Sequence, residues 1–199
     1  MKRSIPVRLL SFLFIAQFGW TACNNSSQTS NGTTDSSTAN QTTKSEDGHA
    51  LATITGTMPD TTVNGTVRFD AENGKVKMNL ELTIPSKANK SVAVHIHDMG
   101  DCGDMGKHAG GHWNPTNQSH GKWGSSSFHS GDIGNVTLDA EGKGSLQMET
   151  DLWSLGGDAK TNILDKTIIV HGGMDDFTSQ PSGNSGERIG CGIIKKTNG

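Results

Sequence analysis

Apolar residues in the long C-terminal part of this chain recur at every second position, and this period constrains the fold more than any other feature. In the clearest run, apolar side chains occupy five alternate positions: Val76, Met78, Leu80, Leu82 and Ile84. Successive side chains of a β-strand point to opposite faces of a sheet, so this run predicts a strand with one buried and one solvated face. No segment shows a convincing helical period of 3.6 residues.

Several shorter runs have the same strand-like character: 52–57, 66–70, 92–97, 135–138, 145–150, 167–171 and 188–194. Turn-forming pairs lie between many of them, such as Asn73 before Gly74 and Glu141 before Gly142. Glycine is abundant, at 26 of 199 residues, which fits strands joined by turns and long ordered loops. We therefore predict an all-β fold, a sandwich or barrel, for residues 48–199.

The first 22 residues are predicted to be a secretory signal peptide. A basic start is followed by the apolar stretch 9–20, which is too short for a comfortable membrane span. Two small residues then precede Cys23. This arrangement resembles the bacterial lipoprotein signal, in which that cysteine carries the lipid. Trp20 departs from the lipoprotein pattern, so secretion without a lipid is the alternative.

Residues 23–47 are predicted to be a lipidated cysteine followed by a disordered tether. No large apolar residue occurs between positions 24 and 47, so this segment cannot bury enough surface to offset its chain entropy. A poorly ordered terminus without a role fits the composition equally well. A lipid on Cys23 would export the domain to the periplasm or the cell surface and anchor it to a membrane.

Charge and cysteine content limit the partners and the compartment. The chain has 17 basic and 20 acidic residues, a formal charge of -3, so we expect no nucleic-acid partner, which would favour a clustered basic surface. Besides Cys23 there are two cysteines, Cys102 and Cys191, and two can pair. Export would place them in an oxidising compartment where a disulfide persists. The sequence leaves the oligomeric state open, a homodimer being one alternative.

The stretch 98–130 does not fit a strand, and histidines occur in it and on both sides of it. His95 and His97 lie two residues apart in a predicted strand, so they share a face with Cα atoms roughly 7 Å apart. Val94 and Ile96 take the opposite, core-facing side. The two imidazoles are therefore predicted to project from the outside of the sheet as an exposed pair that can share one metal ion, copper or zinc. Such a pair on its own is more often incidental.

Further candidate ligands come from the loop and from a later strand end. Three histidines and a carboxylate could supply a closed tetrahedral zinc site: His112, His120, His129 and Asp132. A polar surface loop that happens to be rich in histidine is the alternative. His171 ends the apolar run 168–170, and Asp175 follows in a turn, where it could accept a hydrogen bond from a ligating imidazole. A hydrogen-bonded structural histidine is the alternative for His171, and a solvated turn aspartate is the alternative for Asp175.

Taken together, these residues resemble the metal-binding region of copper/zinc superoxide dismutases. The segments that carry the resemblance are 94–97 (VHIH), 100–102 (GDC), 110–115 (GGHWNP), 120–121 (HG), 129–132 (HSGD), 170–176 (VHGGMDD), 183–184 (GN) and 186–192 (GERIGCG). The resemblance covers essentially all of residues 50–195 and fills each metal-ligand position at family-like spacing. The early cysteine and the Ser-Gly-containing C-terminal loop resemble the bacterial secreted branch.

The resemblance implies an eight-stranded Greek-key β-sandwich or barrel with long metal-binding and electrostatic loops. It implies one copper and one zinc ion per subunit, with copper held by His95, His97, His112 and His171, and zinc by His112, His120, His129 and Asp132. Asp175 would link the two sites through hydrogen bonds, and Cys102 and Cys191 would form a disulfide. The catalytic residues would be His112, which bridges the metals and takes a proton when copper is reduced, and Arg188, at the mouth of the copper channel.

The function implied by the resemblance is dismutation of the superoxide anion to oxygen and hydrogen peroxide by a copper redox cycle, with zinc structural. This would be antioxidant defence outside the cytoplasm. Gly172 and Gly173 stand where some relatives bear channel lysines, so Lys107 or Lys122 is the hypothesised steering charge. His49 and His108 match no ligand position.

Two rival functions belong to other classes. One is a non-catalytic copper-binding lipoprotein, which would have no need of a bridging His112 or of Arg188 as an anion guide. The other is a structural domain stabilised by zinc, which leaves the copper ligands unexplained.

Overall fold

A computed structural model describes residues 47–198 of the chain. The predicted signal peptide, Cys23 and the predicted tether up to residue 46 lie outside the described residues. The strands are β1 (Gly48–Gly56), β2 (Asn64–Glu72), β3 (Lys75–Thr83), β4 (Ser91–His97), β5 (Gly134–Thr137), β6 (Lys143–Thr150), β7 (Thr167–His171), β8 (Arg188–Ile193) and β9 (Lys195–Thr197). Two 3-10 turns, Pro85–Lys87 and Lys107–Ala109, are the only helical elements of this part, and neither could span a bilayer.

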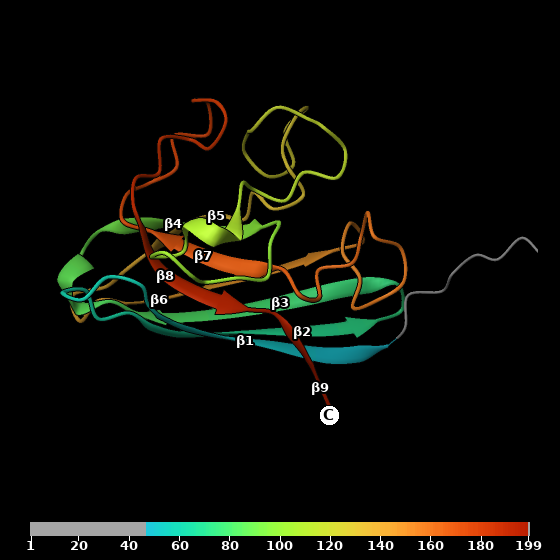
Figure 1. The fold of residues 1–199 in the computed structure, drawn as a ribbon, viewed down its shortest axis with the longest axis horizontal. Helices are drawn as coiled ribbons and strands as arrows, with labels where there is room; N and C mark the ends of the chain where they lie inside the picture. The colour runs from blue at the N-terminus through green and yellow to red at the C-terminus, as the bar shows by residue number, and fades with distance from the viewer. Residues whose placement is uncertain (1–46, 199) are drawn as a thin grey trace, which may run out of the picture. The chain divides into compact units, whose positions relative to one another are not determined.

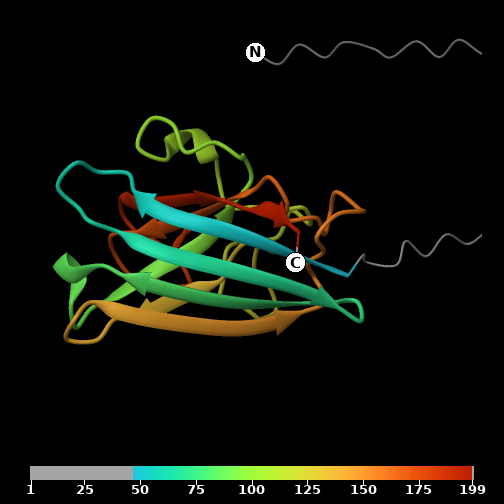
Figure 2. The same ribbon diagram turned by 90° about the horizontal axis from the view of Figure 1, so that it is seen from below.

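All strand pairs are antiparallel, in the order β5-β4-β7-β8-β1-β2-β3-β6, with β9 added beside β1. β4 follows β3 in the chain but is not its neighbour in the sheet, and the same holds for β7 after β6. Both connections therefore cross over from one layer to the other. Figures 1 and 2 show β4, β5 and β7 in one layer and β1, β2, β3 and β6 side by side in the other. This confirms the predicted all-β, eight-stranded Greek-key barrel.

The barrel closes where β5 and β6, the two ends of this order, come into contact. Gly144 in β6 makes the approach possible, because a Cβ there would lie 2.6 Å from the carbonyl oxygen of Thr137 in β5. Any side chain at this position would push the two strands apart. The sheet therefore behaves as a nearly closed barrel.

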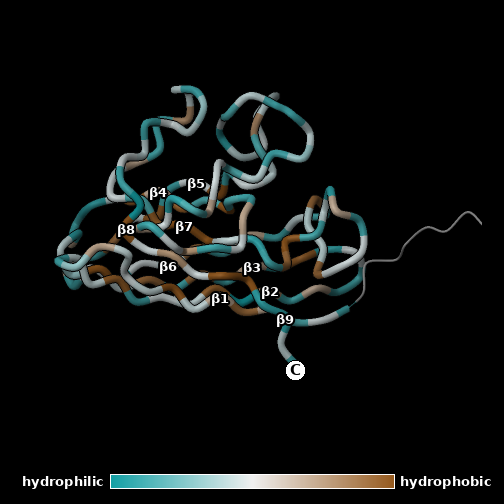
Figure 3. The backbone as a smooth tube through the Cα atoms, in the orientation of Figure 1, coloured by the Kyte–Doolittle hydropathy of each residue, from teal (hydrophilic) through white to brown (hydrophobic). Residues whose placement is uncertain are grey.

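The core lies between the two layers and follows the alternation read from the sequence. Val76, Met78, Leu80, Leu82 and Ile84 are all buried, at 2% exposure or less. Figure 3 shows the apolar segments on the strands between the layers. Each such side chain contributes about 1.5–3 kcal/mol by burial, so the alternating strands define which face points inward.

The structure extends several predicted strands and adds one. The run predicted at 52–57 begins at Gly48 and ends at Gly56, because pairing with β2 and β9 continues the strand through a more polar segment. β9 was not predicted, since its three residues are polar. Its position is set by pairing with His49–Leu51 of β1 rather than by its own pattern.

Two long connections lie over the layer that contains β4 and β7: residues 98–133 between β4 and β5, and residues 172–187 between β7 and β8 (Figure 1). A disulfide between Cys102 and Cys191 ties the first loop to β8, with the two Cα atoms 5.9 Å apart. The pairing implied by the family resemblance is thus present.

Candidate metal centre

One group of four histidines is built on paired strands. His95 and His97 lie on β4, and His171 ends the neighbouring strand β7. His112 comes from the loop, but an isolated antiparallel bridge to His97 sets its main chain alongside β4. One possible ligand atom from each of these residues lies within 4.8 Å of the others. We call this set the copper group.

A second group of four shares His112 and takes its other members from the loop: His120, His129 and Asp132. Asp132 lies at its centre. Its carboxylate accepts a hydrogen bond from Nδ1 of His112 at 2.8 Å and from the main-chain N–H of His129 at 2.8 Å. The ring nitrogens Nδ1 of His120 and His129 lie 3.0 and 3.2 Å from the same carboxylate. We call this set the zinc group.

Each of the six histidines has one buried ring nitrogen with no hydrogen-bond partner in the protein. These atoms are Nδ1 of His95, His120 and His129 and Nε2 of His97, His112 and His171. A buried polar atom without a partner costs about 1–3 kcal/mol, so six in one place need an explanation. Nδ1 of His120 and His129 are close to Asp132 without hydrogen-bond geometry, which is expected if these atoms are aimed at a common point between them.

Hydrogen bonds on the other ring nitrogen fix the tautomer of several of these histidines. Nδ1 of His97 lies 2.9 Å from the carbonyl oxygen of Gly110, and Nδ1 of His171 lies 3.3 Å from that of Gly186. Each Nδ1–H can donate only if Nε2 carries the lone pair. Since imidazole lone pairs bind copper and zinc, and zinc also takes a carboxylate oxygen, the residues present fit both metals.

Burial keeps three histidines of the copper group, His97, His112 and His171, neutral. Desolvation lowers the pKa of His171 to about 3 and that of His112 to about 4, and it lowers the pKa of His97 well below its usual value. Burial alone would raise the pKa of Asp132, but hydrogen bonds from His112 and His129 hold it well below its usual range. At neutral pH His97, His112 and His171 are therefore neutral and Asp132 is ionised, which favours metal binding.

Asp175 contacts one histidine of each group. Its Oδ2 lies 2.8 Å from Nε2 of His95, and its Oδ1 lies 2.9 Å from Nε2 of His120. The carboxyl group is buried, and its pKa is lowered, because hydrogen bonds from these two histidines outweigh the opposing effect of burial. Asp175 thus orients a ring in each group and leaves Nδ1 of each free to bind.

A pocket of about 370 Å³ opens onto the copper group, and its lining includes His97, His112, His171 and Arg188. Strand pairing places Arg188 opposite His171. The guanidinium is held by two donated hydrogen bonds of 2.6 Å, from Nη1 to the carbonyl oxygen of Gly106 and from Nη2 to that of Gly110. A fixed positive charge therefore lies at the edge of this pocket.

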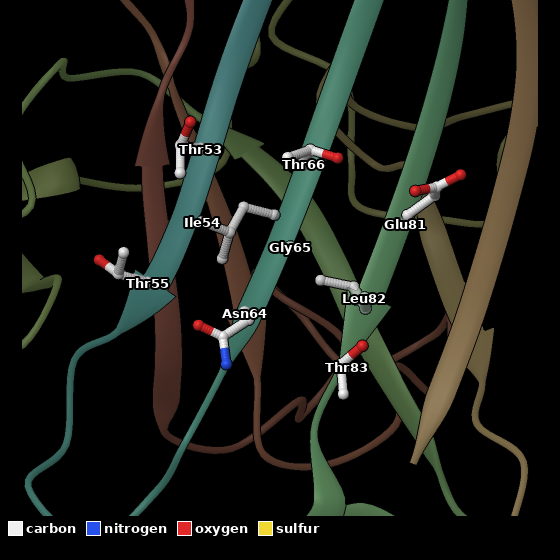
Figure 4. A pocket seen from close by; sticks show the side chains of 9 residues that line it. All are labelled: Thr53, Ile54, Thr55, Asn64, Gly65, Thr66, Glu81, Leu82 and Thr83. Atoms are coloured by element: carbon white, nitrogen blue, oxygen red, sulfur yellow. The ribbon is translucent and has the colours of Figure 1, made fainter. Parts of the chain in front are cut away.

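A second hollow, on the outer face of β1, β2 and β3, offers no comparable chemistry. Figure 4 shows it around Gly65, with Thr53, Thr66 and Glu81 among its lining side chains. A Cβ at Gly65 would lie 2.6 Å from Cδ2 of Leu82, so this glycine keeps β2 and β3 close together. The lining holds no histidine or cysteine, which makes the two histidine groups the candidate site.

The structure brings together all the candidate ligands named from the sequence, with one difference in their setting. His95 and His97 project from the outside of the sheet as expected, but they are not exposed, because the two loops bury them to 1% or less. His49 and His108 lie elsewhere, on the surface, each beside one aspartate. Gln180 was missed; it contacts the main chain of His120, and its sequence context carries no signal for that role.

Comparisons with known proteins agree with this geometry. The family model for copper/zinc superoxide dismutase matches residues 63–194. A copper-zinc superoxide dismutase of Aquifex aeolicus is 35% identical over 111 residues, covering 54% of this chain and 66% of that relative. One from Paramecium bursaria Chlorella virus 1 is 34% identical over 151 residues, covering 73% of this chain and 76% of the relative.

Two further similarities concern location and fold. An extracellular copper-zinc superoxide dismutase of Caenorhabditis elegans is 35% identical over 147 residues, covering 63% of this chain and 66% of the relative. The crystal structure of the clock protein EA4 superposes with a TM-score of 0.67 at 26% identity, covering 76% of this chain and 96% of that one.

Proposed function

This chain belongs to the copper/zinc superoxide dismutase family, and from that premise we propose which of its residues carry each part of the reaction. The chain is a superoxide dismutase that uses copper and zinc to convert superoxide to oxygen and hydrogen peroxide. The observation that carries the assignment is the set of six buried, unpartnered ring nitrogens that converge in two groups sharing His112.

Copper belongs with the copper group: Nδ1 of His95 and Nε2 of His97, His112 and His171. When bound, it supplies the one-electron redox chemistry that zinc cannot. The strands hold three of these four rings, and carbonyl or carboxylate acceptors fix the orientation of His95, His97 and His171. Nε2 of His112 faces this group, and we expect it to hold a proton during each cycle.

Zinc would be held by Nδ1 of His112, His120 and His129 and by the carboxylate of Asp132, and Nδ1 of His112, which otherwise donates to Asp132, would give up its proton to bind. Asp132 is held in place by main-chain donors from His129 and Gly121, at 2.8 and 3.2 Å. This group orders the loop and holds His112 in position for the copper group. Its role is structural, because zinc does not change oxidation state.

Arg188 guides the substrate. Superoxide is a small anion, and a fixed guanidinium at the pocket edge raises its local concentration there. The hydrogen bonds that Arg188 donates to the carbonyl oxygens of Gly106, Lys107 and Gly110 leave its charge in place but restrict its movement. Substitution by lysine would keep the charge but lose the forked geometry of those contacts.

Direct measurement of superoxide decay by pulse radiolysis tests this function. The chain is loaded with copper and zinc, its metal content is checked, and a His171→Ala variant is measured beside it. We expect near-diffusion-limited decay for the native chain and collapse of the rate in the variant. His108→Ala, on the surface, is the matched control and should keep the native rate. Tight binding of both metals without turnover would favour a copper buffer instead.

The steering lysines stay a separate hypothesis. Lys107 lines a groove with Arg188 and Glu187 beside the pocket, and Nζ of Lys122 lies 6.0 Å from the ring centre of Phe177. Neutralising both lysines should lower the rate and flatten its dependence on salt, because screening weakens exposed charges. A salt dependence equal to that of the native chain would exclude them.

Export and lipid attachment are also proposals. The disulfide in the structure and the extracellular relative support export, and the segment before Cys23 supports a lipid on that cysteine. A Cys23→Ser chain should move from the membrane fraction to the soluble fraction while keeping its dismutase rate. Its mass should lack the lipid. A native chain that is itself soluble and carries no lipid would mean that the protein is secreted without an anchor.

The Cys23→Ser variant also tests whether the chain is a monomer or a homodimer. Sedimentation of the Cys23→Ser chain distinguishes a monomer from a dimer without the lipid. A single species at the monomer mass would exclude the homodimer.

A further inference from the structure

The zinc group contains one ligand whose main chain no strand or turn holds. His120 lies in a stretch of loop without regular secondary structure. Within residues 47–198, no main-chain group of another residue forms a hydrogen bond with its N–H or C=O. Yet the residue is buried, at 4% exposure, and a buried main-chain group that lacks a partner is destabilising.

Gln180, in the other long loop, supplies both missing partners. Its Oε1 accepts a hydrogen bond from the His120 N–H at 2.9 Å, and its Nε2 donates to the His120 carbonyl oxygen at 2.9 Å. One carboxamide thus pairs with both main-chain groups of a single residue, as a neighbouring strand would. The bond from Nε2 to the carbonyl oxygen of Thr178, at 3.3 Å, fixes the orientation of the amide.

The same loop also holds the side chain of His120. Asp175 accepts from its Nε2, and Gly183 packs against this contact, since a Cβ at Gly183 would lie 2.6 Å from Nε2 of His120. Directly after Gln180, the residues Pro181 and Ser182 line the pocket over the copper group. The position of His120 and the wall of the pocket are therefore set by one short segment.

We propose that Gln180 is a positioning residue of the zinc group, which fixes the main chain of His120 and so holds its Nδ1 toward the metal. The proposal rests on the assignment of His120 as a zinc ligand in the proposed function. Gln180 acts through His120 and touches no substrate. Its loss should raise the rate at which zinc leaves without changing the strand-borne part of the copper group.

The test compares metal release from the full exported chain loaded with copper and zinc. Zinc release to a chelating indicator and copper release to a copper-specific chelator are timed for the native chain, Gln180→Ala and Gln180→Glu. Gln118→Ala is the matched control, because Gln118 lies in the loop of His120 with only a weak side-chain contact of 3.4 Å to Thr116. The visible spectrum of cobalt placed in the zinc group reports the geometry of the ligands directly.

We expect zinc release to be about 10-fold faster in Gln180→Ala, the lower end of the effect of removing an outer contact from a metal ligand. Copper release should stay within about twofold of native, and the cobalt spectrum should shift. Gln180→Glu keeps the acceptor but loses the donor, so its zinc release should fall between native and Gln180→Ala. Gln180→Glu also provides the measurement if Gln180→Ala does not fold. Gln118→Ala should behave as native.

Native zinc retention in both Gln180 variants, or an equal increase in zinc and copper release, would overturn the positioning role while leaving the dismutase assignment intact. A native chain that holds no zinc would overturn the zinc assignment and this inference together. Failure of dismutation with both metals tightly held would instead contradict the proposed function alone.

Discussion

The copper group and the zinc group are adjacent and share a residue, but different parts of the molecule position them. His95, His97 and His171 lie on two paired strands of the barrel, so folding of the barrel alone places them. His120, His129 and Asp132 lie in a loop and are placed by hydrogen bonds to one another and to the second loop. The first group is set by sheet geometry, and the second depends on contacts between loops.

This difference has a consequence for the order of assembly. The strand-borne rings should be close to their final positions before any metal binds, whereas the loop-borne ligands should gain more order from metal binding. His112 connects the two, because its main chain is bridged to β4 while its Nδ1 contacts Asp132.

His112 belongs to both groups, so replacing it should have the largest effect. His112→Ala removes one ligand from each group. We expect the affinity for both metals to fall by more than the roughly 100-fold that losing an outer contact can cost, and dismutation to fall with it. Metal content after dialysis and superoxide decay measure the two effects. Unchanged affinity for either metal would show that His112 does not serve both groups.

Removing the disulfide should disturb the surroundings of the copper group more than those of the zinc group. Cys102 and Cys191 are separated by 89 positions, for which loop entropy predicts a stabilisation of about 4–5 kcal/mol. The paired change Cys102→Ser and Cys191→Ser also frees the loop whose carbonyl oxygens hold Arg188, so we expect a lower dismutation rate. Urea unfolding of the metal-free chain measures the stability. Cys23→Ser is the control, and a paired variant as stable as that control would contradict the prediction.

Acid should separate the two groups in the metal-free chain. The pKa of His171 and His112 is about 3 and 4 when folded, against about 6.5 when unfolded. Between these values the unfolded chain binds protons that the folded chain does not, so stability falls as pH falls from 6.5 toward 4. His112 alone should account for about 3 kcal/mol of that loss.

Asp132 should contribute to acid unfolding only at lower pH. Its pKa is depressed in the folded state, so its stabilisation is complete above about pH 4 and is lost below it. Urea unfolding at a series of pH values measures both ranges. His171→Gln should flatten the upper range by about 1.4 kcal/mol per pH unit, and its effect should end near pH 3, the folded pKa of His171. An upper range that kept its slope would contradict the assignment of that loss to the copper group.

Replacing Asp175 should have the smallest of these effects. It compares the two groups most directly, because Asp175 contacts both of them. Asp175→Asn keeps the shape of the side chain but weakens its hydrogen bonds to His95 and His120. We expect each metal to bind about 10–100-fold more weakly, with zinc affected more, since its ligands lack the support of strands. Asp176→Asn is the neighbouring control. Equal weakening of both metals would mean that the strands give the copper group no advantage.

The sequence predicts the copper group better than the zinc group for the same physical reason. Two-residue spacing in a strand determines that His95 and His97 share a face, so the pair follows from the pattern alone. The pattern does not show that loops fold over that face, which is why the pair was expected to be exposed. In the loop no period relates His112, His120 and His129, so their residue types alone could not distinguish a zinc site from a surface loop rich in histidine, and the family resemblance was needed to favour the site.

The remaining differences lie where tertiary contacts override local pattern. β9 is a strand only because β1 pairs with it, and Gln180 matters only because the second loop folds back onto His120. A glutamine before a proline carries no sign of such a contact. The barrel core, by contrast, was predicted well, because alternation at every second position is itself the physical cause of burial.

The closure of the barrel at Gly144 bears on behaviour in concentrated solution. A sheet with free edges offers unpaired N–H and C=O groups to any other chain, and such edges are a route to fibres and precipitates. Here β5 and β6, the two strands at the ends of the order, face each other. A larger residue at Gly144 would open this seam, so a single Cβ would be enough to make the protein prone to aggregation.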